Sequence, residues 1–276
     1  MDMRRAGLTL IELLIVIAVI AMLIGISLPV LHIARQQANA VACGSNIKQL
    51  SLALTAYDQE NGTFPHGLVD LTLRTVPPPG GYAGNAAYDN VGWWWFDFLA
   101  NIRGKNPDKD TILWCPSKNI TAPWPSVNVL CGNYGVNQAI CKNAKKTKNS
   151  EFTGRPLSLY QIRSSAETLL IVDSGYSLIT WQQATNAPGQ PPLSLRKGRP
   201  GGEARKGASY VPGLWINKER SSWPGFEEDA IYGRHPNKSV NVGFVDGHVD
   251  RVKADDLFVE AIDGSYINRS PLWLPR

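Results

Sequence analysis

An uninterrupted apolar run lies close to the N-terminus. It extends for 24 residues, from Leu8 to Leu31, and Glu12 is its one ionisable side chain. A helix of that length would be roughly 36 Å long, enough to cross a hydrocarbon layer of about 30 Å. A carboxylate inside such a segment is expensive to bury, so it marks a functional position. The pattern predicts a helix over residues 8–31 that is buried in a membrane or in an apolar protein core.

The helical pattern continues past this run but becomes one-sided. Asn61-Gly62 can form a left-handed cap, and Pro65 prevents the helix from resuming. We therefore expect residues 32–62 to be an amphipathic continuation of the helix, with a globular domain packed on its apolar face. The residues of that face recur at helical spacing: Ile33, Ala40, Cys43, Ile47, Leu50, Leu54 and Tyr57.

Residues 63–276 predict one globular α+β domain. Trp93–Leu99 predicts a short helix or strand, with core packing favoured over a carbohydrate platform. Residues 182–208 are rich in Gln, Pro, Gly and Arg, and they predict a long exposed loop.

The β-structure is expected in the last third of the domain. Residues 168–173 form a buried apolar strand pattern, and two alternating segments, 240–245 and 248–252, flank Asp246-Gly247. An Asp-Gly pair between alternating segments is a strong signal for a hairpin. The expected fold is α+β, with a long N-terminal helix packed on an antiparallel sheet that contains these strands.

A short leader with two arginines precedes the apolar run. It ends at Gly7, which is followed by an apolar residue and Thr-Leu-Ile-Glu12, and Pro29 lies twenty-one residues past Leu8. From Gly7 through Pro29 this arrangement resembles the N-terminus of type IV pilins and type II secretion pseudopilins.

The resemblance implies that prepilin peptidase removes residues 1–7 by cutting between Gly7 and Leu8, and that Leu8 is N-methylated. Glu12 would then pair with the N-terminal amine of a neighbouring subunit, and Pro29 would kink or locally unwind the helix. The implied partners are the peptidase, other pilin-like subunits and the inner membrane. The basic leader would remain cytoplasmic, and the C-terminal domain would be exported to the periplasm or the cell surface.

Two other interpretations of the apolar run remain. A cleaved secretory signal has a core of about 7–15 residues and a small-x-small site soon after it. Here the nearest such site, Ala38-Asn39-Ala40, follows the polar Arg35-Gln36-Gln37. A plain membrane anchor would leave the combination of Gly7, Glu12 and Pro29 unexplained.

The C-terminal hairpin carries a second resemblance. Its sequence looks like a prepilin-type, processing-associated domain, abundant in planctomycetes, that is named for a His, nine residues and then Asp-Gly. In this chain ten residues separate His235 from Asp246 and Gly247, so a fixed His–Asp geometry is in doubt. Blocks that begin at Cys43, Trp114 and Ser165 also look like that family.

The net charge bears on the kind of partner, and the cysteines bear on the cellular compartment. The net charge of +5 is too small to indicate a nucleic-acid partner. The four cysteines would meet an oxidising compartment if the domain is exported, and no Cys-x-x-Cys pair indicates a metal knuckle. Three full pairings are open, and Cys131–Cys141 is the pair we expect. The cysteines are Cys43, Cys115, Cys131 and Cys141.

Candidate chemistry in the domain is sparse. His235, Asp246, His248 and Asp173 could be combined into a metal site, but Asp246-Gly247 is adequately explained as turn chemistry. No nucleophile elbow, zinc-protease or phosphate-loop motif occurs. We expect no catalytic residue, no bound metal and no cofactor. Calcium is a secondary alternative, with oxygen ligands available from Asp250, Asp255, Asp256 and Asp263.

The sequence as a whole predicts a structural subunit and not an enzyme. It would be a prepilin-like protein matured at Gly7 and assembled into a type II secretion pseudopilus or a pilus-like filament. One rival is a non-polymerising, membrane-tethered protein that binds secreted cargo or a surface glycan through the tryptophan-rich region. A second rival is a tethered hydrolase that uses the region of His235 and Asp246.

Overall fold

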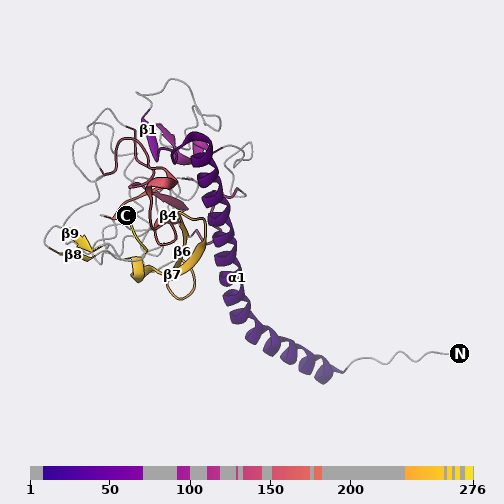
Figure 1. The fold of residues 1–276 in the computed structure, drawn as a ribbon. Coiled ribbons are helices and arrows are strands. Elements are labelled where there is room, and N and C mark those ends of the chain that lie inside the picture. Colours follow the sequence, from indigo (N-terminus) through magenta and orange to yellow (C-terminus); the bar gives the residue numbers. More distant parts are fainter. Residues whose placement is uncertain are drawn as a thin grey trace, which may run out of the picture. The chain divides into compact units, whose positions relative to one another are not determined.

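The fold was analysed in a computed structural model that describes residues 9–70, 92–99, 111–118, 129, 133–144, 151–174, 177–181, 234–257, 260–262, 265–267 and 271–275. The elements, in chain order, are α1 (Leu10–Asn61), β1 (Leu68–Asp70), β2 (Gly92–Trp94), η1 (Trp95–Phe98), β3 (Tyr134–Asn137), η2 (Leu159–Gln161), β4 (Leu169–Asp173), β5 (Leu178–Ile179), β6 (Ser239–Phe244), β7 (Val249–Lys253), η7 (Ala254–Leu257), β8 (Glu260–Ile262) and β9 (Ser265–Ile267) (Figure 1). The α+β class expected from the sequence is confirmed.

Helix α1 belongs to two compact units. The first unit is Met1–Ala38, and the second is Asn39–Arg276. The helix ends at Asn61, and Gly62 follows with φ +73°, as the Asn-Gly cap predicted. The periodic apolar face is also confirmed within the second unit. Its buried members are Ala40, Cys43, Ile47, Leu50 and Leu54, and Tyr57 is partly buried, whereas Ile33, in the first unit, is exposed.

The main sheet has five strands in the order β5-β3-β4-β6-β7. Neighbours are antiparallel except for β5, which is parallel to β3 at one edge. The sheet is therefore mixed at that edge, where the sequence predicted only antiparallel pairs. The predicted hairpin is β6–β7, with Gly247 at φ +88° in its turn. The predicted strand at 168–173 is β4, paired on both sides.

The second half of α1 packs on one face of this sheet. The alternation of β6 turns Asn241 and Gly243 toward the helix, while Val242 joins the apolar cluster on the other face. A Cβ built on Gly243 would lie 2.8 Å from a methyl group of Ile47 and 2.8 Å from one of Ile171. Helix and sheet can approach this closely because position 243 has no side chain.

The other face of the sheet is covered by the C-terminal segment. Leu272 makes a backbone bridge to Thr168, and Leu169 donates a hydrogen bond to its carbonyl at 3.0 Å. Trp273 is buried there, and its indole donates to the carbonyl of Leu257 at 3.0 Å. Asn137 fixes the arrangement, because its Nδ2 donates to the carbonyls of both Leu169 and Trp273. The three inner strands β3, β4 and β6 are therefore buried on both faces, whereas the edge strand β7 is largely exposed.

The cysteine pairing differs from the one expected. Cys43 on α1 is bonded to Cys115, across 72 residues of sequence and a Cα–Cα distance of 5.4 Å. Cys141 is a buried free cysteine, so the predicted Cys131–Cys141 pair is wrong; Cys131 itself lies outside the described residues. Sequence proximity favoured a short loop, whereas the fold places Cys141 in the core, at the end of the turn after β3.

Candidate functional site

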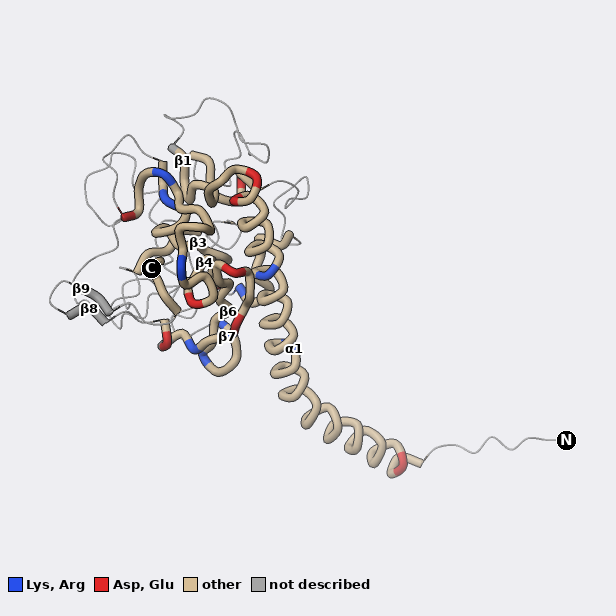
Figure 2. Tube along the Cα trace, in the orientation of Figure 1, with Lys and Arg blue, Asp and Glu red and all other residues tan. Residues whose placement is uncertain are grey.

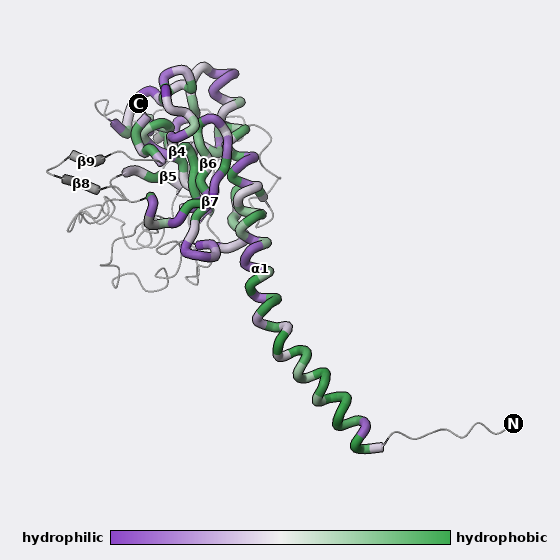
Figure 3. Tube along the Cα trace, turned by 60° about the horizontal axis from the view of Figure 1, so that its bottom comes forward, coloured by the Kyte–Doolittle hydropathy of each residue, from purple (hydrophilic) through white to green (hydrophobic). Residues whose placement is uncertain are grey.

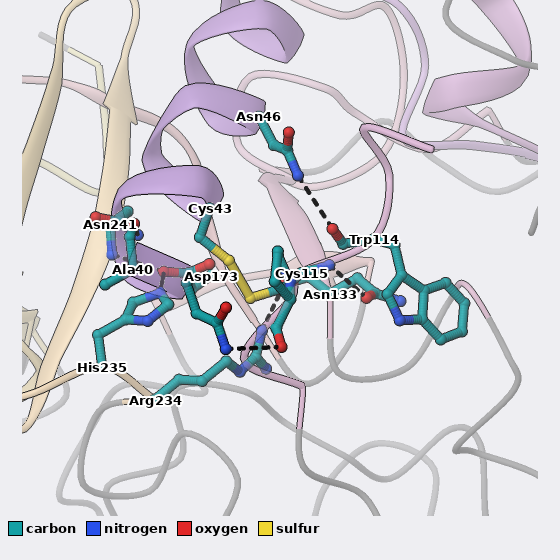
Figure 4. Close-up of a disulfide and its surroundings, with 12 residues drawn as sticks. Ala40, Cys43, Asn46, Trp114, Cys115, Asn133, Asp173, Arg234, His235 and Asn241 are labelled. Carbon is teal, nitrogen blue, oxygen red and sulfur yellow. Dashed lines mark hydrogen bonds and ion pairs between the residues drawn. A yellow bond between two sulfur atoms is a disulfide. The ribbon is translucent and has the colours of Figure 1, made fainter. Parts of the chain in front are cut away.

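Figure 4 shows a buried polar cluster where α1 meets the sheet. The imidazole of His235 lies 2.7 Å from Oδ2 of Asp173, through its Nε2. The same carboxylate oxygen accepts a 2.7 Å hydrogen bond from the backbone N–H of Asn241. The side chains of His235 and Asp173 are 0% exposed. The Cys43–Cys115 disulfide lies against this pair.

Each member of this cluster is positioned by a different element. Asp173 is the last residue of β4, and His235 precedes β6 in an isolated bridge to Ser239. Cys43 is on α1, and the backbone N–H of Cys115 donates to Asn133 Oδ1 at 3.0 Å. The four residues come from four segments that are distant in sequence.

Two further side chains surround the cluster. Arg234 donates from its two terminal nitrogens to the carbonyls of Asn133 and Ser174, at 3.1 Å each. The hydroxyl of Tyr134 lies 3.4 Å from Cys43 Sγ. Burial raises the pKa of Tyr134 far above the usual phenol value, and the negative charge of Asp173 acts in the same direction. Tyr134 is therefore a neutral hydrogen-bonding group beside the sulfur.

The structure separates the four residues that the sequence suggested as a metal site. His235 and Asp173 are together in the buried cluster, whereas Asp246 and His248 lie at the β6–β7 turn. There Asp246 Oδ1 accepts from the backbone N–H of His248 and lies 2.6 Å from its Nδ1, with both side chains partly exposed. His248 also stacks on Phe244, with ring centroids 4.2 Å apart. Asp246 and His248 thus stabilise the β6–β7 turn itself.

The other candidates in the domain have mixed outcomes. Trp93, Trp94 and Trp95 are all buried, so the expectation of core packing is confirmed for this row of tryptophans. Asp250 and Asp256 are exposed residues of β7 and η7, while Asp263 lies outside the described residues, as does the side chain of Asp255. The predicted loop at 182–208 is likewise outside them.

The N-terminal end of α1 is closed by reciprocal hydrogen bonds between Thr9 and Glu12. Glu12 Oε2 accepts from the backbone N–H and from the hydroxyl of Thr9, both at 2.8 Å, and Thr9 Oγ1 accepts from the Glu12 N–H at 3.3 Å. This is a capping box, which satisfies donors that a helix start leaves unpaired. The sequence Thr-x-x-Glu carries the signal for this cap, a second role for Glu12 beside the one that the pilin resemblance implies.

The first unit is apolar on every side of the helix. Its large side chains from Leu10 to Ile33 are exposed. Among the described residues 9–34, Glu12 is the one acidic or basic residue apart from His32, so this part of α1 is drawn almost wholly in tan in Figure 2 and mostly in green in Figure 3. Ser27 satisfies its hydroxyl internally by donating to the Leu23 carbonyl at 2.7 Å. A helix that is apolar all round belongs in lipid or in a protein core. By length and composition, α1 can cross a membrane.

Pro29 lies inside α1 without ending it. The helix runs continuously from Leu10 to Asn61. Local unwinding at Pro29 is therefore absent, and the alternative, a kink, stays a prediction, because proline removes the donor that would bond to the Gly25 carbonyl. Gly7 and Leu8 lie outside the described residues.

Comparison with known families identifies the N-terminal segment. Residues 2–28 match the family model described as the prokaryotic N-terminal methylation motif. The chain carries a prepilin-type N-terminus. This match supports a type IV pilin-like protein that is a substrate of prepilin peptidase. No curated protein and no solved structure matches the chain in these comparisons.

Proposed function

We propose that the protein is a prepilin-like structural subunit that is cleaved between Gly7 and Leu8 and then assembled into a type II secretion pseudopilus or a pilus-like filament. The observation that carries the proposal is the methylation motif at residues 2–28, on a helix that is apolar on every side. Before assembly, this helix would hold the subunit in the inner membrane, with the basic leader in the cytoplasm.

In this proposal, the carboxylate of Glu12 forms the charge pair that joins neighbouring subunits during assembly. Cleavage would leave an ammonium group on Leu8, and a free ammonium and a free carboxylate are both costly in an apolar filament core. The capping box uses Oε2 of Glu12 for both bonds from Thr9. Its Oε1 takes no part in the cap, so one carboxylate can close its own helix and also pair with the amine of a neighbouring subunit.

The domain is proposed to be an exported, non-enzymatic module. A disulfide such as Cys43–Cys115 is the state expected in an oxidising compartment. The His235–Asp173 pair is enclosed, and its side chains have no exposed surface on which a substrate could be bound. The buried tryptophans give the glycan-binding alternative no support.

The two roles of Glu12 can be separated by substitution. Glu12→Gln can keep the capping box, because glutamine also serves at that position, but it removes the charge. Thr9→Ala removes the two hydrogen bonds of the cap that use the hydroxyl, and it keeps the carboxylate and its bond from the backbone N–H of residue 9. We expect Glu12→Gln to be made, inserted and cleaved yet scarce in sheared filaments, whereas Thr9→Ala assembles close to wild type.

Membrane fractionation, the mass of the mature chain and immunoblots of sheared filaments measure these steps in one culture. If Glu12→Gln enters filaments as well as wild type does, the proposed charge pair is wrong and the helix is only an anchor. If both variants are lost from filaments to the same extent, Glu12 acts through its cap alone.

A further inference from the structure

The buried cluster holds four metal-ligand side chains from distant segments. One ligand atom from each of Cys43, Cys115, Asp173 and His235 lies within 4.8 Å of all the others. The cysteines and Asp173 are 0% exposed, and the imidazole of His235 is also fully covered. Two thiol sulfurs, an imidazole and a carboxylate are the donor types that zinc takes in proteins.

Two atoms of the cluster are buried without a hydrogen-bond partner among the described residues. They are Oδ1 of Asp173 and Nδ1 of His235. Buried polar atoms are nearly always paired, because leaving one unsatisfied costs its full desolvation free energy. The pair is therefore half-satisfied: one side is fixed by Asn241, and the other side is left for a ligand.

We propose that Cys43, Cys115, Asp173 and His235 form a binding site for one thiophilic divalent cation, Zn²⁺ or its like, which is available when the Cys43–Cys115 disulfide is reduced. Zinc bonds of about 2.0–2.3 Å place tetrahedral ligand atoms roughly 3.3–3.8 Å apart. The observed separations of up to 4.8 Å need a contraction of about 1 Å. The two sulfurs must in addition move apart once their bond is broken, because two ligands of one zinc ion are farther apart than bonded sulfurs. The proposal therefore requires rotation of all four side chains.

The surrounding residues suit such an ion. The 3.4 Å contact between the Tyr134 hydroxyl and Cys43 Sγ can become a hydrogen bond to a thiolate. Outer contacts of this kind hold metal ligands in place. Two thiolates, one carboxylate and one Zn²⁺ sum to a charge of −1, and the guanidinium of Arg234, which donates to the carbonyl of Ser174 next to Asp173, offsets it.

The disulfide and the metal are alternatives at one position. Reduction breaks the S–S bond, with two electrons and two protons added to give two thiols. A phosphine reductant supplies the electrons and becomes a phosphine oxide, with oxygen and protons from water. Zn²⁺ then displaces both thiol protons. The cluster would therefore link α1 to the segment around Cys115 in both redox states, through the disulfide when oxidised and through the metal ion when reduced.

Metal titration of the full-length chain in detergent tests the proposal. We expect the phosphine-reduced protein to bind one Co²⁺ with thiolate-to-cobalt charge-transfer bands, and Zn²⁺ to displace it in a one-to-one ratio. The oxidised protein should show neither. Asp173→Asn should weaken zinc binding by more than about tenfold, because the loss of even an outer partner of a metal ligand costs about 10–100-fold. The double variant Cys43→Ser, Cys115→Ser should lose the charge-transfer bands.

Two matched controls should bind as wild type does. Cys141→Ala removes the buried free cysteine outside the cluster, whose thiol has a pKa raised by burial and so stays protonated. His248→Ala removes the exposed hairpin histidine. If the double serine variant keeps the bands, or if a control abolishes them, the proposed ligands are wrong.

Folding is followed by circular dichroism in the same samples. A reduced chain that stays folded and binds no metal overturns the proposal, and the cluster is then only a disulfide beside a His–Asp pair. A reduced chain that unfolds and is not refolded by zinc overturns it too, because a native metal site must favour the folded state. These outcomes do not depend on filament assembly and leave the proposed function untouched.

Discussion

The contact between α1 and the sheet can be tested at Gly243. Adding one methyl group there places a Cβ 2.8 Å from methyl groups of Ile47 and Ile171, and also against the Ser51 hydroxyl. All three neighbours are fully buried, so they cannot move aside into solvent. Overpacking of this kind costs about 1–3 kcal/mol. For a unit of this size, each kcal/mol lowers the melting temperature by about 2–4 °C.

Gly44 is the matched control, on the helix side of the same interface. A Cβ on Gly44 would lie 3.5 Å from Asn241 Oδ1, which is ordinary contact. Alanine is also a better helix former than glycine by about 0.8–1.0 kcal/mol. We therefore expect Gly44→Ala to hold or raise the melting temperature, and Gly243→Ala to lower it by about 2–12 °C.

Thermal unfolding of the detergent-solubilised chain, followed by circular dichroism, measures both variants. The reasoning about the interface is refuted if Gly243→Ala melts with wild type, or if Gly44→Ala is the more damaging change. Either result would mean that the second half of α1 does not pack on β6 as described.

Two other predictions concern the same domain. Replacing Cys43 and Cys115 with serine should lower the free energy of unfolding by about 4 kcal/mol, because the disulfide closes a loop of 72 residues, whereas Cys141→Ala should cost about 1 kcal/mol in the same denaturant titration. A comparable loss at Cys141 would argue against the pairing. Burial raises the pKa of Asp58, against a hydrogen bond from the Leu159 N–H that lowers it, and no basic residue in the last turn of α1 offsets its charge. The folded state therefore binds a proton on this carboxyl more readily than the unfolded state does. Protonation therefore stabilises the folded state below the unfolded pKa, and this contribution is lost as pH rises through the raised folded pKa. Asp58→Asn should raise the melting temperature at pH 7 by about 1–4 °C and lose this advantage in acid. An advantage that persists unchanged in acid would contradict this cause.

Much of the fold could be predicted because its signals are local. The end of α1 followed from Asn61-Gly62, and the β6–β7 hairpin followed from Asp246-Gly247 between alternating residues. The burial of the tryptophans followed from their apolar context. These features depend on neighbours in sequence, where periodicity and turn chemistry are informative.

The remaining features depend on how distant segments meet. The partner of Cys43 is set by the packing of the loop at Cys115 against α1, which no spacing rule encodes. His235 and Asp173 were named together from the sequence, but Asp246 lies at the far end of β6, which takes up six of the ten residues between it and His235. The edge strand β5 has two residues, too few for a periodic signal.

The intact mass of the protein extracted from membranes tests the central claim most directly. The account predicts a chain that starts at Leu8, carries one added N-terminal methyl group and contains a disulfide. Gly7→Val is the control, because a bulky residue next to the cut should leave the leader attached and the amine unmethylated. A wild-type chain that retains residues 1–7 would contradict the assignment as a prepilin-like subunit.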